Sequence, residues 1–296
     1  SQTVRDMLNA LLKVADGDFT VRAPVVSSDE FGCLAETFNR MVPALEDQMR
    51  MKQSLEVAQN VQQNLLPSIP PEPEGLELAG GSVYCDETGG DFYDYFPCPD
   101  DPSTTAVAVG DVSGHGVPAA LLMASARSLL RCRAGRADAP SDIIRDVNRL
   151  LCDDTYNSGR FLTLFFLALA KDKPLRWVRA GHDPALLYDP ETDRFSELKG
   201  EGIPLGVVKD FAYQAFEAPG LAPGQILAIG TDGIWEMCGG ADGEMYGKDR
   251  LRSVIREHAD LPAEDIHRAV RENLRAWLGQ GRIDDDVTLV VVKRSS

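Results

Sequence analysis

The sequence predicts an α+β sandwich preceded by an all-α coiled coil. In the first 66 residues, apolar side chains recur at alternating spacings of four and three, which is the pattern of a coiled-coil seam. From Gly75 onward, short β-rich runs alternate with helical stretches that are grouped in the middle and near the end of the chain. Hairpins with helices in blocks indicate an α+β sandwich and not a repeated β-α-β unit. A length of 296 residues is also typical of about two domains.

Two amphipathic helices are expected before residue 46. A break from Asp16 to Ser28 separates them, and Ser28 or Asp29 is expected to start the second helix. Two short helices cannot bury their seams alone, so a homodimer that forms a parallel four-helix bundle is expected. The seam residues are Val4, Leu8, Leu11 and Ala15, then Phe31, Leu34, Phe38, Met41 and Leu45.

A further helix is expected from about Glu46 to Leu66. Its heptad register is weak, because Gln48 and Lys52 occupy the seam just before the apolar positions begin. The segment is therefore either a passive linker or a helix whose rotation transmits a signal. A proline-rich run, from Pro67 to Pro73, ends the helix and marks the domain boundary.

In the remainder of the chain, Pro118 suits the first turn of a helix, and Ser141 is expected to cap the next one. Two more helices are expected at 248–258 and 262–278. Strands are expected at 76–85, 92–97, 105–111, 161–169, 175–180, 185–188, 212–215, 225–231 and 287–292.

Charge and composition argue against several classes of protein. The net charge is −16 and basic residues do not cluster, so neither nucleic acid nor an anionic membrane surface is expected as a partner. No apolar run approaches the ~20 residues that span a bilayer. The six cysteines form no C-x-x-C pair, and none is followed six positions later by arginine. The sequence thus indicates neither a zinc or disulfide framework nor a cysteine-nucleophile phosphatase.

Four acidic motifs occur where predicted strands end: GGDFYDYF from Gly89, GDVSGHG from Gly110, GTDGIWE from Gly230 and DDDVTL from Asp284. A single aspartate in such a place is commonly a turn residue, but four in one domain favour a shared site. Carboxylate oxygens without paired His or Cys select hard cations such as Mg²⁺ or Mn²⁺. Two such ions about 4 Å apart can promote phosphoryl transfer without a protein nucleophile.

These motifs resemble those of the metal-dependent, type 2C serine/threonine protein phosphatases. The similarity is to the bacterial branch that includes the stage II sporulation protein E and the sigma-factor regulatory phosphatases. It extends from about Val57 to Val292 and includes AQNVQQNLLP from Ala58, RAGHDPALLYD from Arg179 and GIPLG from Gly202. The resemblance implies an αββα sandwich that binds two Mn²⁺ or Mg²⁺ ions. A water-derived hydroxide would then attack the phosphorus.

By this resemblance, Asp111 bridges both metals. Asp91 and the carbonyl of Val112 complete one metal site, and Asp232 and Asp285 complete the other. Asp285 is favoured over its neighbours because it is the first residue of DDVT. The same four aspartates, Asp91, Asp111, Asp232 and Asp285, are the expected catalytic residues. No other cofactor is expected.

Other polar residues of the motifs are assigned lesser roles. Asp94 is expected at the surface, with action through water as the alternative. His115 is expected to support a turn or helix start instead of acting as a general acid. His182 is expected to order a loop near the site by hydrogen bonding. His258 and His267 are expected on solvated helix faces.

The first segment resembles a HAMP signalling domain, in the GDF run from Gly17 and in SDEFGCLAETFNRM from Ser28. A plain helical hairpin or dimerisation coil is the alternative. Such modules usually follow a transmembrane helix. The sequence is therefore interpreted as a cytoplasmic fragment of a protein anchored in the bacterial inner membrane through an upstream segment. The expected domains are a HAMP module at 1–50, a linker helix and proline-rich junction at 51–74 and a phosphatase domain at 75–296.

The leading hypothesis is a protein phosphatase regulated by the HAMP dimer. Its expected partner is a phosphoprotein substrate, an anti-sigma-factor antagonist. Two alternatives remain: an inactive pseudo-phosphatase that acts as a relay protein, and a hydrolase of small phosphate esters. All four candidate aspartates are present, which argues against the first. The absence of a G-x-x-x-x-G-K-[ST] motif argues against a nucleotide-specific form of the second.

Overall fold

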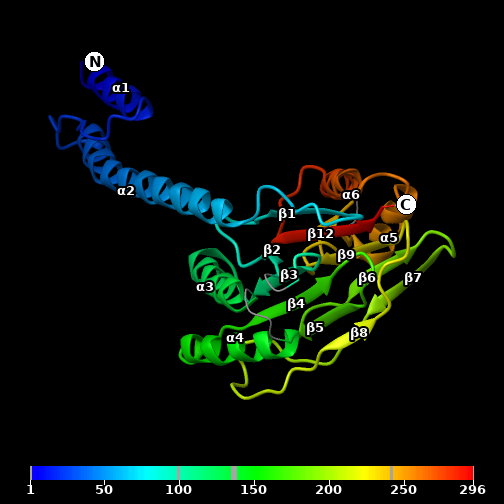
Figure 1. Ribbon diagram of the computed structural model, residues 1–296. Helices are drawn as coiled ribbons and strands as arrows, with labels where there is room; N and C mark the ends of the chain where they lie inside the picture. The colour runs from blue at the N-terminus through cyan, green and yellow to red at the C-terminus, as the bar shows by residue number, and fades with distance from the viewer. Residues whose placement is uncertain (1, 99–100, 135–138, 241–242, 296) are drawn as a thin grey trace. The chain divides into compact units, whose positions relative to one another are not determined.

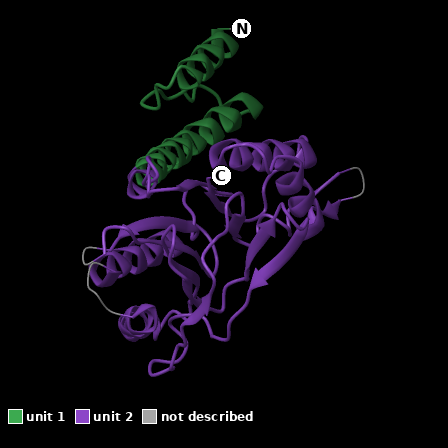
Figure 2. Ribbon diagram, turned by 45° about the vertical axis from the view of Figure 1, so that its right-hand side comes forward, with its two compact units in different colours: residues 1–60 green, residues 61–296 purple. Residues whose placement is uncertain are grey.

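The computed structural model describes residues 2–98, 101–134, 139–240 and 243–295. The chain divides into two compact units, residues 1–60 and residues 61–296 (Figure 2). This division falls inside the segment that the sequence assigns to the linker. Among the helices of the described ranges, none is both long enough and apolar enough to cross a membrane.

The first unit contains α1 (Gln2–Ala15) and most of α2 (Glu30–Leu65). Asp29 caps α2, because its Oδ1 accepts hydrogen bonds from the backbone N–H groups of Phe31 (3.1 Å) and Gly32 (3.2 Å). The expected helix start is therefore confirmed. The expectation of a separate helix from Glu46 is wrong, since α2 is continuous and includes Pro43. The polar seam at Gln48 and Lys52 weakens the heptad pattern without breaking the helix.

A small core holds the first unit together. It consists of Ala10, Ala23, Ala35, Phe38 and Val42. The connector between the helices is fixed by a pair of hydrogen bonds between the Asn39 side-chain amide and the backbone of Ala23 (2.7 and 2.8 Å). Most of the predicted seam remains outside this core. Its exposed large residues are Val4, Leu8, Leu11, Phe31, Leu34 and Met41.

The second unit is a sandwich of two antiparallel five-stranded sheets (Figure 1). The first sheet has the order β1 (Leu76–Val83), β12 (Val287–Arg294), β9 (Ile226–Gly230), β6 (Ala185–Asp189) and β7 (Arg194–Leu198). The second has the order β2 (Phe92–Pro97), β3 (Thr105–Val112), β4 (Leu162–Leu169), β5 (Leu175–Ala180) and β8 (Phe216–Ala218). A two-stranded ribbon joins β10 (Cys238–Gly239) to β11 (Glu244–Met245).

Two pairs of helices cover the outer faces of the sheets. α3 (Gly116–Ala134) and α4 (Pro140–Thr155) pack on the second sheet, and α6 (Ala263–Leu278) packs on the first beside α5 (Gly247–Glu257). The layers are therefore helix, sheet, sheet and helix, which confirms the predicted α+β sandwich.

The sequence of the central strands explains this layering. Along β3, Ala106 and Ala108 face α3 and α4, whereas Val107 and Val109 face the other sheet. In β12, Val291 faces α5 and α6, while Val290 and Val292 face the interior. Because side chains alternate between the faces of a strand, a strand buried on both faces needs a continuous apolar run.

Three local expectations were wrong. The segment 212–215 is not a strand; β8 begins at Phe216 and pairs with β5. The expected cap at Ser141 is replaced by Ala139, which precedes Pro140 in the first turn of α4 and makes no side-chain capping bond. His267 is buried instead of solvated, because the same face of α6 packs its Val270 and Leu274 into the core.

Candidate metal centre

The predicted aspartates meet where the two sheets place their strand ends. In the second sheet, Phe92 pairs with Gly110, so the start of β2 lies beside the end of β3. This register brings Asp91, just before β2, close to Asp111, near the end of β3. In the first sheet, Gly230 pairs with Leu289, and the end of β9 lies beside the start of β12. Asp232 and Asp285 extend from these two ends.

The four carboxyl groups interact electrostatically across the two sheets. Burial, together with the charges of Asp232 and Asp285, raises the pKa of Asp111 to about 7. Burial also raises the pKa of Asp91, and Asp111 is the next largest cause. The pKa values of Asp232 and Asp285 are raised as well, chiefly by burial. Four acids that oppose one another's ionisation form a site that a cation would stabilise.

The donor chemistry of this cluster fits hard divalent cations. Carboxylate and carbonyl oxygens are the ligands that Mg²⁺ and Mn²⁺ prefer. The Val112 carbonyl lies at the same place, since a Cβ on Gly90 would stand 2.6 Å from that oxygen. In the described part of the chain, no group of three or more His, Cys, Asp or Glu side chains lies close enough together to coordinate a metal ion as the side chains stand. The residues that could supply oxygen ligands are Asp91, Asp111, Asp232 and Asp285 through their side chains and Val112 through its carbonyl.

Asp286 organises the loop that carries Asp91. Its Oδ1 accepts a hydrogen bond from the Cys85 N–H (2.9 Å), and its Oδ2 accepts one from the Gly90 N–H (2.7 Å). Gly89 is required here because a Cβ would collide with the Asp286 carboxylate. This residue was considered in the sequence only as an alternative to Asp285. Its structural role was missed because the second and third aspartates of a DDD run look alike in a sequence.

Threonine side chains link the two halves of the cluster. The Thr231 hydroxyl donates to Oδ2 of Asp91 (2.7 Å), and the backbone N–H of Thr288 donates to the Thr231 Oγ1 (3.0 Å). Asp91 in the second sheet is thereby tied to β9 and β12 of the first. The hydrogen bond from Thr231 fixes Oδ2 of Asp91 and therefore the orientation of the carboxylate group.

A cavity of about 160 Å³ opens beside Asp111 and Asp232. Its other lining residues are Thr163, Gly181, His182, Asp183 and Glu236. A phosphoryl group is small enough to enter a cavity of this volume. The acidic lining would oppose an anion unless cations were bound, which agrees with the donor chemistry of the cluster.

His182 forms part of the wall of this cavity as a fully hydrogen-bonded residue. Its Nδ1 lies 2.9 Å from the Thr163 hydroxyl, and its Nε2 lies 3.1 Å from the carbonyl of Gly230. Burial lowers the pKa of His182 to about 4, so the imidazole is neutral near pH 7. Nε2 therefore donates to the carbonyl and Nδ1 accepts from the hydroxyl. The predicted role in ordering the loop is confirmed.

His115 lies at the start of α3, where the sequence predicts it. Its Nδ1 is 2.6 Å from Oδ2 of Asp86, and the side chain is largely exposed. The ring is close enough to Asp285 to oppose the rise in the pKa of that carboxyl group. His115 thus stands at the rim of the cluster and outside the small cavity.

Asp94 is not a surface residue, and that expectation was wrong. Its side chain is fully buried and pairs with Arg127 (2.9 Å) and Arg131 (2.6 Å) of α3. Arg131 makes two hydrogen bonds to the carboxylate, through Nε and an Nη nitrogen. A buried carboxylate of this kind requires paired cations, and the pair attaches β2 to α3.

Comparisons with known proteins agree with this fold. The SiaA PP2C domain of Pseudomonas aeruginosa superposes with a TM-score of 0.73 at 24% identity, covering 83% of this chain and 98% of that domain. The phosphatase domain of SpoIIE from Bacillus subtilis, solved with a fragment of its regulatory domain, gives 0.63 at 19% identity, with coverages of 75% and 64%. RsbX, solved in complex with magnesium, gives 0.55 at 18% identity, with coverages of 76% and 98%. The fold is that of the metal-dependent, type 2C protein phosphatases.

Sequence models assign both parts of the chain. The model of the stage II sporulation protein E (SpoIIE) family matches residues 101–295, and the HAMP domain model matches residues 1–47. The chain therefore belongs to the SpoIIE family of protein serine phosphatases and contains a HAMP domain. The resemblances noted in the sequence are confirmed.

Three curated relatives are similar over most of the chain. Phosphoserine phosphatase RsbU of Bacillus subtilis is 29% identical over 248 residues, which is 83% of this chain and 72% of RsbU. Protein IcfG of Synechocystis is 25% identical, covering 99% of this chain and 51% of IcfG. Phosphoserine phosphatase RsbP of Bacillus subtilis is 23% identical, covering 82% of this chain and 58% of RsbP. The chain thus spans about half to three quarters of the length of these relatives.

Proposed function

We propose that this protein is a metal-dependent phosphoserine/phosphothreonine protein phosphatase. In this proposal, two Mn²⁺ or Mg²⁺ ions are held by Asp91, Asp111, the Val112 carbonyl, Asp232 and Asp285. The observation that carries the proposal is the set of four carboxyl groups with raised pKa values at the meeting edges of two sheets, of which Asp91 is buried, Asp111 and Asp232 are partly buried and Asp285 is exposed. Such a cluster is costly to ionise without cations, and bound cations would offset that cost.

The bound cations would supply an activated water and would neutralise charge on the phosphoryl oxygens. The chain's own residues position this chemistry. Asp286 and Thr231 hold the loop and the carboxylate of Asp91. His182 is neutral and both ring nitrogens have partners, so it orients the wall of the cavity and does not transfer a proton. The serine or threonine oxygen of the substrate takes its proton from water.

The proposed substrate is a phosphoserine in an anti-sigma-factor antagonist protein. Two relatives, RsbU and RsbP, are phosphoserine phosphatases by name, and RsbU aligns with most of this chain. The cavity of about 160 Å³ admits a phosphoryl group and little more, so the protein part of the substrate would lie on the surface around it. This favours a phosphoprotein over a small ester that must be enclosed to be recognised.

Regulation by the N-terminal module is proposed from contacts at the end of α2. The Gln62 side chain is buried, its Nε2 donates to the Gly89 carbonyl (2.6 Å), and its Oε1 accepts from the Gly89 N–H (3.2 Å). Gly89 is two residues before Asp91. The Tyr93 hydroxyl also donates to the Pro67 carbonyl (3.0 Å). A shift of this helix end would therefore move the loop that presents Asp91.

Dimerisation is the proposed source of that shift. In the first unit, large apolar side chains of the predicted seam are exposed, including Leu8 and Leu34 at about half of their surface. A second copy of the same helices would cover them in a parallel bundle. The signal would then change the packing of this bundle and reach residues 61–66 through the continuous helix α2.

Hydrolysis of 4-nitrophenyl phosphate with and without Mn²⁺ tests the proposed activity. We expect hydrolysis by the intact chain only with metal, and a loss of at least about 100-fold in Asp232→Asn. Asp284→Asn is the matched control, because it removes one exposed charge from the same run of acids, and it should retain activity within about threefold.

Other outcomes would favour the alternatives. Metal-independent hydrolysis, or full activity of Asp232→Asn, would contradict the proposed centre. Measurable Mn²⁺ binding with no hydrolysis of any phosphoserine peptide or ester would favour a pseudo-phosphatase that acts as a relay protein. Faster turnover of free phosphate esters than of phosphoserine peptides would favour a small-ester hydrolase.

A further inference from the structure

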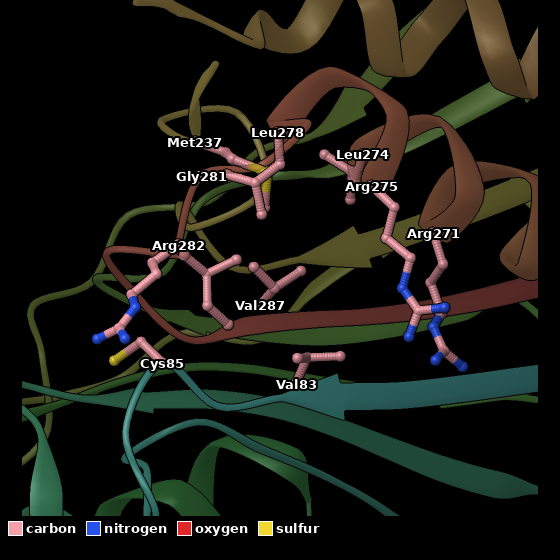
Figure 3. Close-up of a pocket in the computed structure, with 11 residues that line it drawn as sticks. Val83, Cys85, Met237, Arg271, Leu274, Arg275, Leu278, Gly281, Arg282 and Val287 are labelled. Carbon is pink, nitrogen blue, oxygen red and sulfur yellow. The ribbon is translucent and has the colours of Figure 1, made fainter.

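A second, larger pocket lies between α6 and the strands β1 and β12 (Figure 3). It has a volume of about 430 Å³. Its lining combines apolar side chains with three arginines and includes no acidic residue; the residues are Val83, Cys85, Met237, Arg271, Leu274, Arg275, Leu278, Gly281, Arg282, Ile283 and Val287. None of these residues lines the small cavity beside Asp111, so the pocket is separate from the proposed metal centre.

The arginine side chains lie at the two ends of this pocket, and the apolar side chains lie between them. Arg271 and Arg275, one helical turn apart on α6, lie together at one end, and Arg282 lies with Cys85 at the other (Figure 3). All three arginines are exposed. None of them forms an ion pair with a carboxylate within the ranges that the structure describes, although the chain carries a net charge of −16. Unpaired guanidinium groups beside an apolar lining favour an anionic ligand.

We propose that this pocket binds a small amphipathic anion, with a carboxylate or similar headgroup on an apolar body. The volume lies within the range of roughly 300–1,000 Å³ that is typical of small-molecule sites. Leu274, Leu278 and Val287 contact the apolar body, and Arg271 and Arg275 pair with the headgroup. An uncharged molecule would form no ion pair with the guanidinium groups, and a cation would be repelled by them.

The walls of this pocket are continuous with segments of the proposed metal centre. The backbone N–H of Cys85 donates to Asp286, and Val287 directly follows that residue. Met237 directly follows Glu236, which lines the small cavity. A ligand in the pocket would thus contact three residues that adjoin the proposed metal centre, Cys85, Met237 and Val287. Binding itself does not depend on the phosphatase proposal and can be measured without metal.

Isothermal titration calorimetry of the full chain with three ten-carbon probes tests the proposal. The probes are decanoate, decanol and decyltrimethylammonium, used in metal-free buffer below their aggregation concentrations. We expect decanoate to bind with one site per chain, and the two other probes to bind at least about tenfold more weakly, because each loses the charge-assisted hydrogen bonds.

Variants of the pocket locate the binding site. Arg271→Gln combined with Arg275→Gln should lower the affinity for decanoate at least about tenfold and leave the affinity for decanol unchanged. Arg268→Gln is the control, because that residue is on the same helix but pairs with Asp265 and does not line the pocket. Val83→Phe should weaken both decanoate and decanol by filling the pocket; Val83 is 40% exposed at the end of β1, so the larger ring is compatible with folding.

Equal affinity for all three probes would overturn the proposal, because the arginines would then play no part. Unchanged decanoate affinity in both the double arginine variant and Val83→Phe would also overturn it, because the probe would be bound elsewhere. Circular dichroism of each variant establishes that a loss of binding is not a loss of folding.

Discussion

The carboxylate of Asp286 accepts the backbone N–H of Gly90 at 2.7 Å, and this bond fixes the loop that presents Asp91. The two residues are far apart in the sequence and precede strands of different sheets, Asp286 before β12 and Gly90 before β2. The contact explains why a glycine pair precedes Asp91 and why an acid follows Asp285. It also separates two functions within one acidic run: Asp286 accepts N–H groups of the segment that carries Asp91, whereas Asp285 accepts only the adjacent N–H of Asp286 among the hydrogen bonds of the described residues.

Replacement of Asp286 by asparagine should therefore weaken metal binding without removing a ligand. The amide has one acceptor oxygen, and its NH₂ group would face a backbone N–H that has no other partner. We expect the Mn²⁺ concentration for half-maximal activity to rise by about 10- to 100-fold, as for other losses of a residue that orients a ligand. Asp284→Asn is the control. An unchanged Mn²⁺ requirement in a folded Asp286→Asn protein would show that the loop does not depend on this bond.

Gln62 should couple the end of α2 to the metal centre. In Gln62→Leu the two hydrogen bonds to Gly89 are lost, while the buried volume is nearly kept. We expect a lower affinity for Mn²⁺ by calorimetry and a small loss of stability. Gln63→Leu changes an exposed residue one position along the same helix and should leave the Mn²⁺ affinity and the stability unchanged. Equal Mn²⁺ affinity of Gln62→Leu and the native chain would remove the main support for regulation through this helix.

The affinity for Mn²⁺ should rise with pH across neutrality. The raised pKa of Asp111, about 7, means that this carboxyl group is largely protonated below pH 7 when no metal is bound. A cation must displace that proton, so binding weakens as the pH falls from 8 to 6. Calorimetry at pH 6 in buffers of different ionisation enthalpy should detect proton release. An affinity that is constant between pH 6 and pH 8, with no proton release, would contradict the proposed ligand.

Removal of Asp94 should be strongly destabilising. Asp94→Ala leaves Arg127 almost fully buried without its partner, for which we expect a loss of about 3–5 kcal/mol in the free energy of unfolding. Urea denaturation measures this loss of stability. The loss should be smaller in an Arg127→Met background, because the orphaned charge is then absent. Asp210→Ala, which breaks an exposed pair with Arg149, should cost less than about 1 kcal/mol. Similar losses for Asp94→Ala and Asp210→Ala would contradict this interpretation.

The exposed seam of the first unit should mediate dimerisation. Leu34→Lys places a charge on the seam and should shift the chain toward monomer in sedimentation velocity. Glu36→Lys is a matched control at an exposed position off the seam. If dimerisation controls the enzyme, the rate of hydrolysis must change with the oligomeric state. A Leu34→Lys protein that is shown to be monomeric and yet hydrolyses at the rate of the unmodified chain would reject the coupling.

Much of the fold could be predicted because strand and helix patterns are local. Strands β2 and β5 were predicted with their observed bounds, since their apolar runs end at proline or glycine-rich turns. The strand β7 was missed because its sequence, RFSEL, is mostly polar and is specified by pairing with β6. The segment 212–215 was assigned wrongly because the aromatic Tyr213 is buried against the helical layer without belonging to a strand.

The site could be predicted less completely than the fold. The motifs located the four aspartates, but a sequence does not show which side chains fill the space around an acid. Asp94 was expected at the surface because no neighbouring residue in the sequence reveals that Arg127 and Arg131 approach it from α3. His267 was expected in solvent because it was assigned to a polar helix face, whereas the packing of α6 buries it.

Anomalous scattering from crystals grown with Mn²⁺ tests the central claim most directly. We expect two manganese peaks, both at the carboxylate of Asp111. One should be completed by Asp91 and the Val112 carbonyl, and the other by Asp232 and Asp285. Absence of manganese at these residues in the native chain at saturating Mn²⁺, or manganese bound elsewhere while these carboxylates bind none, would contradict it.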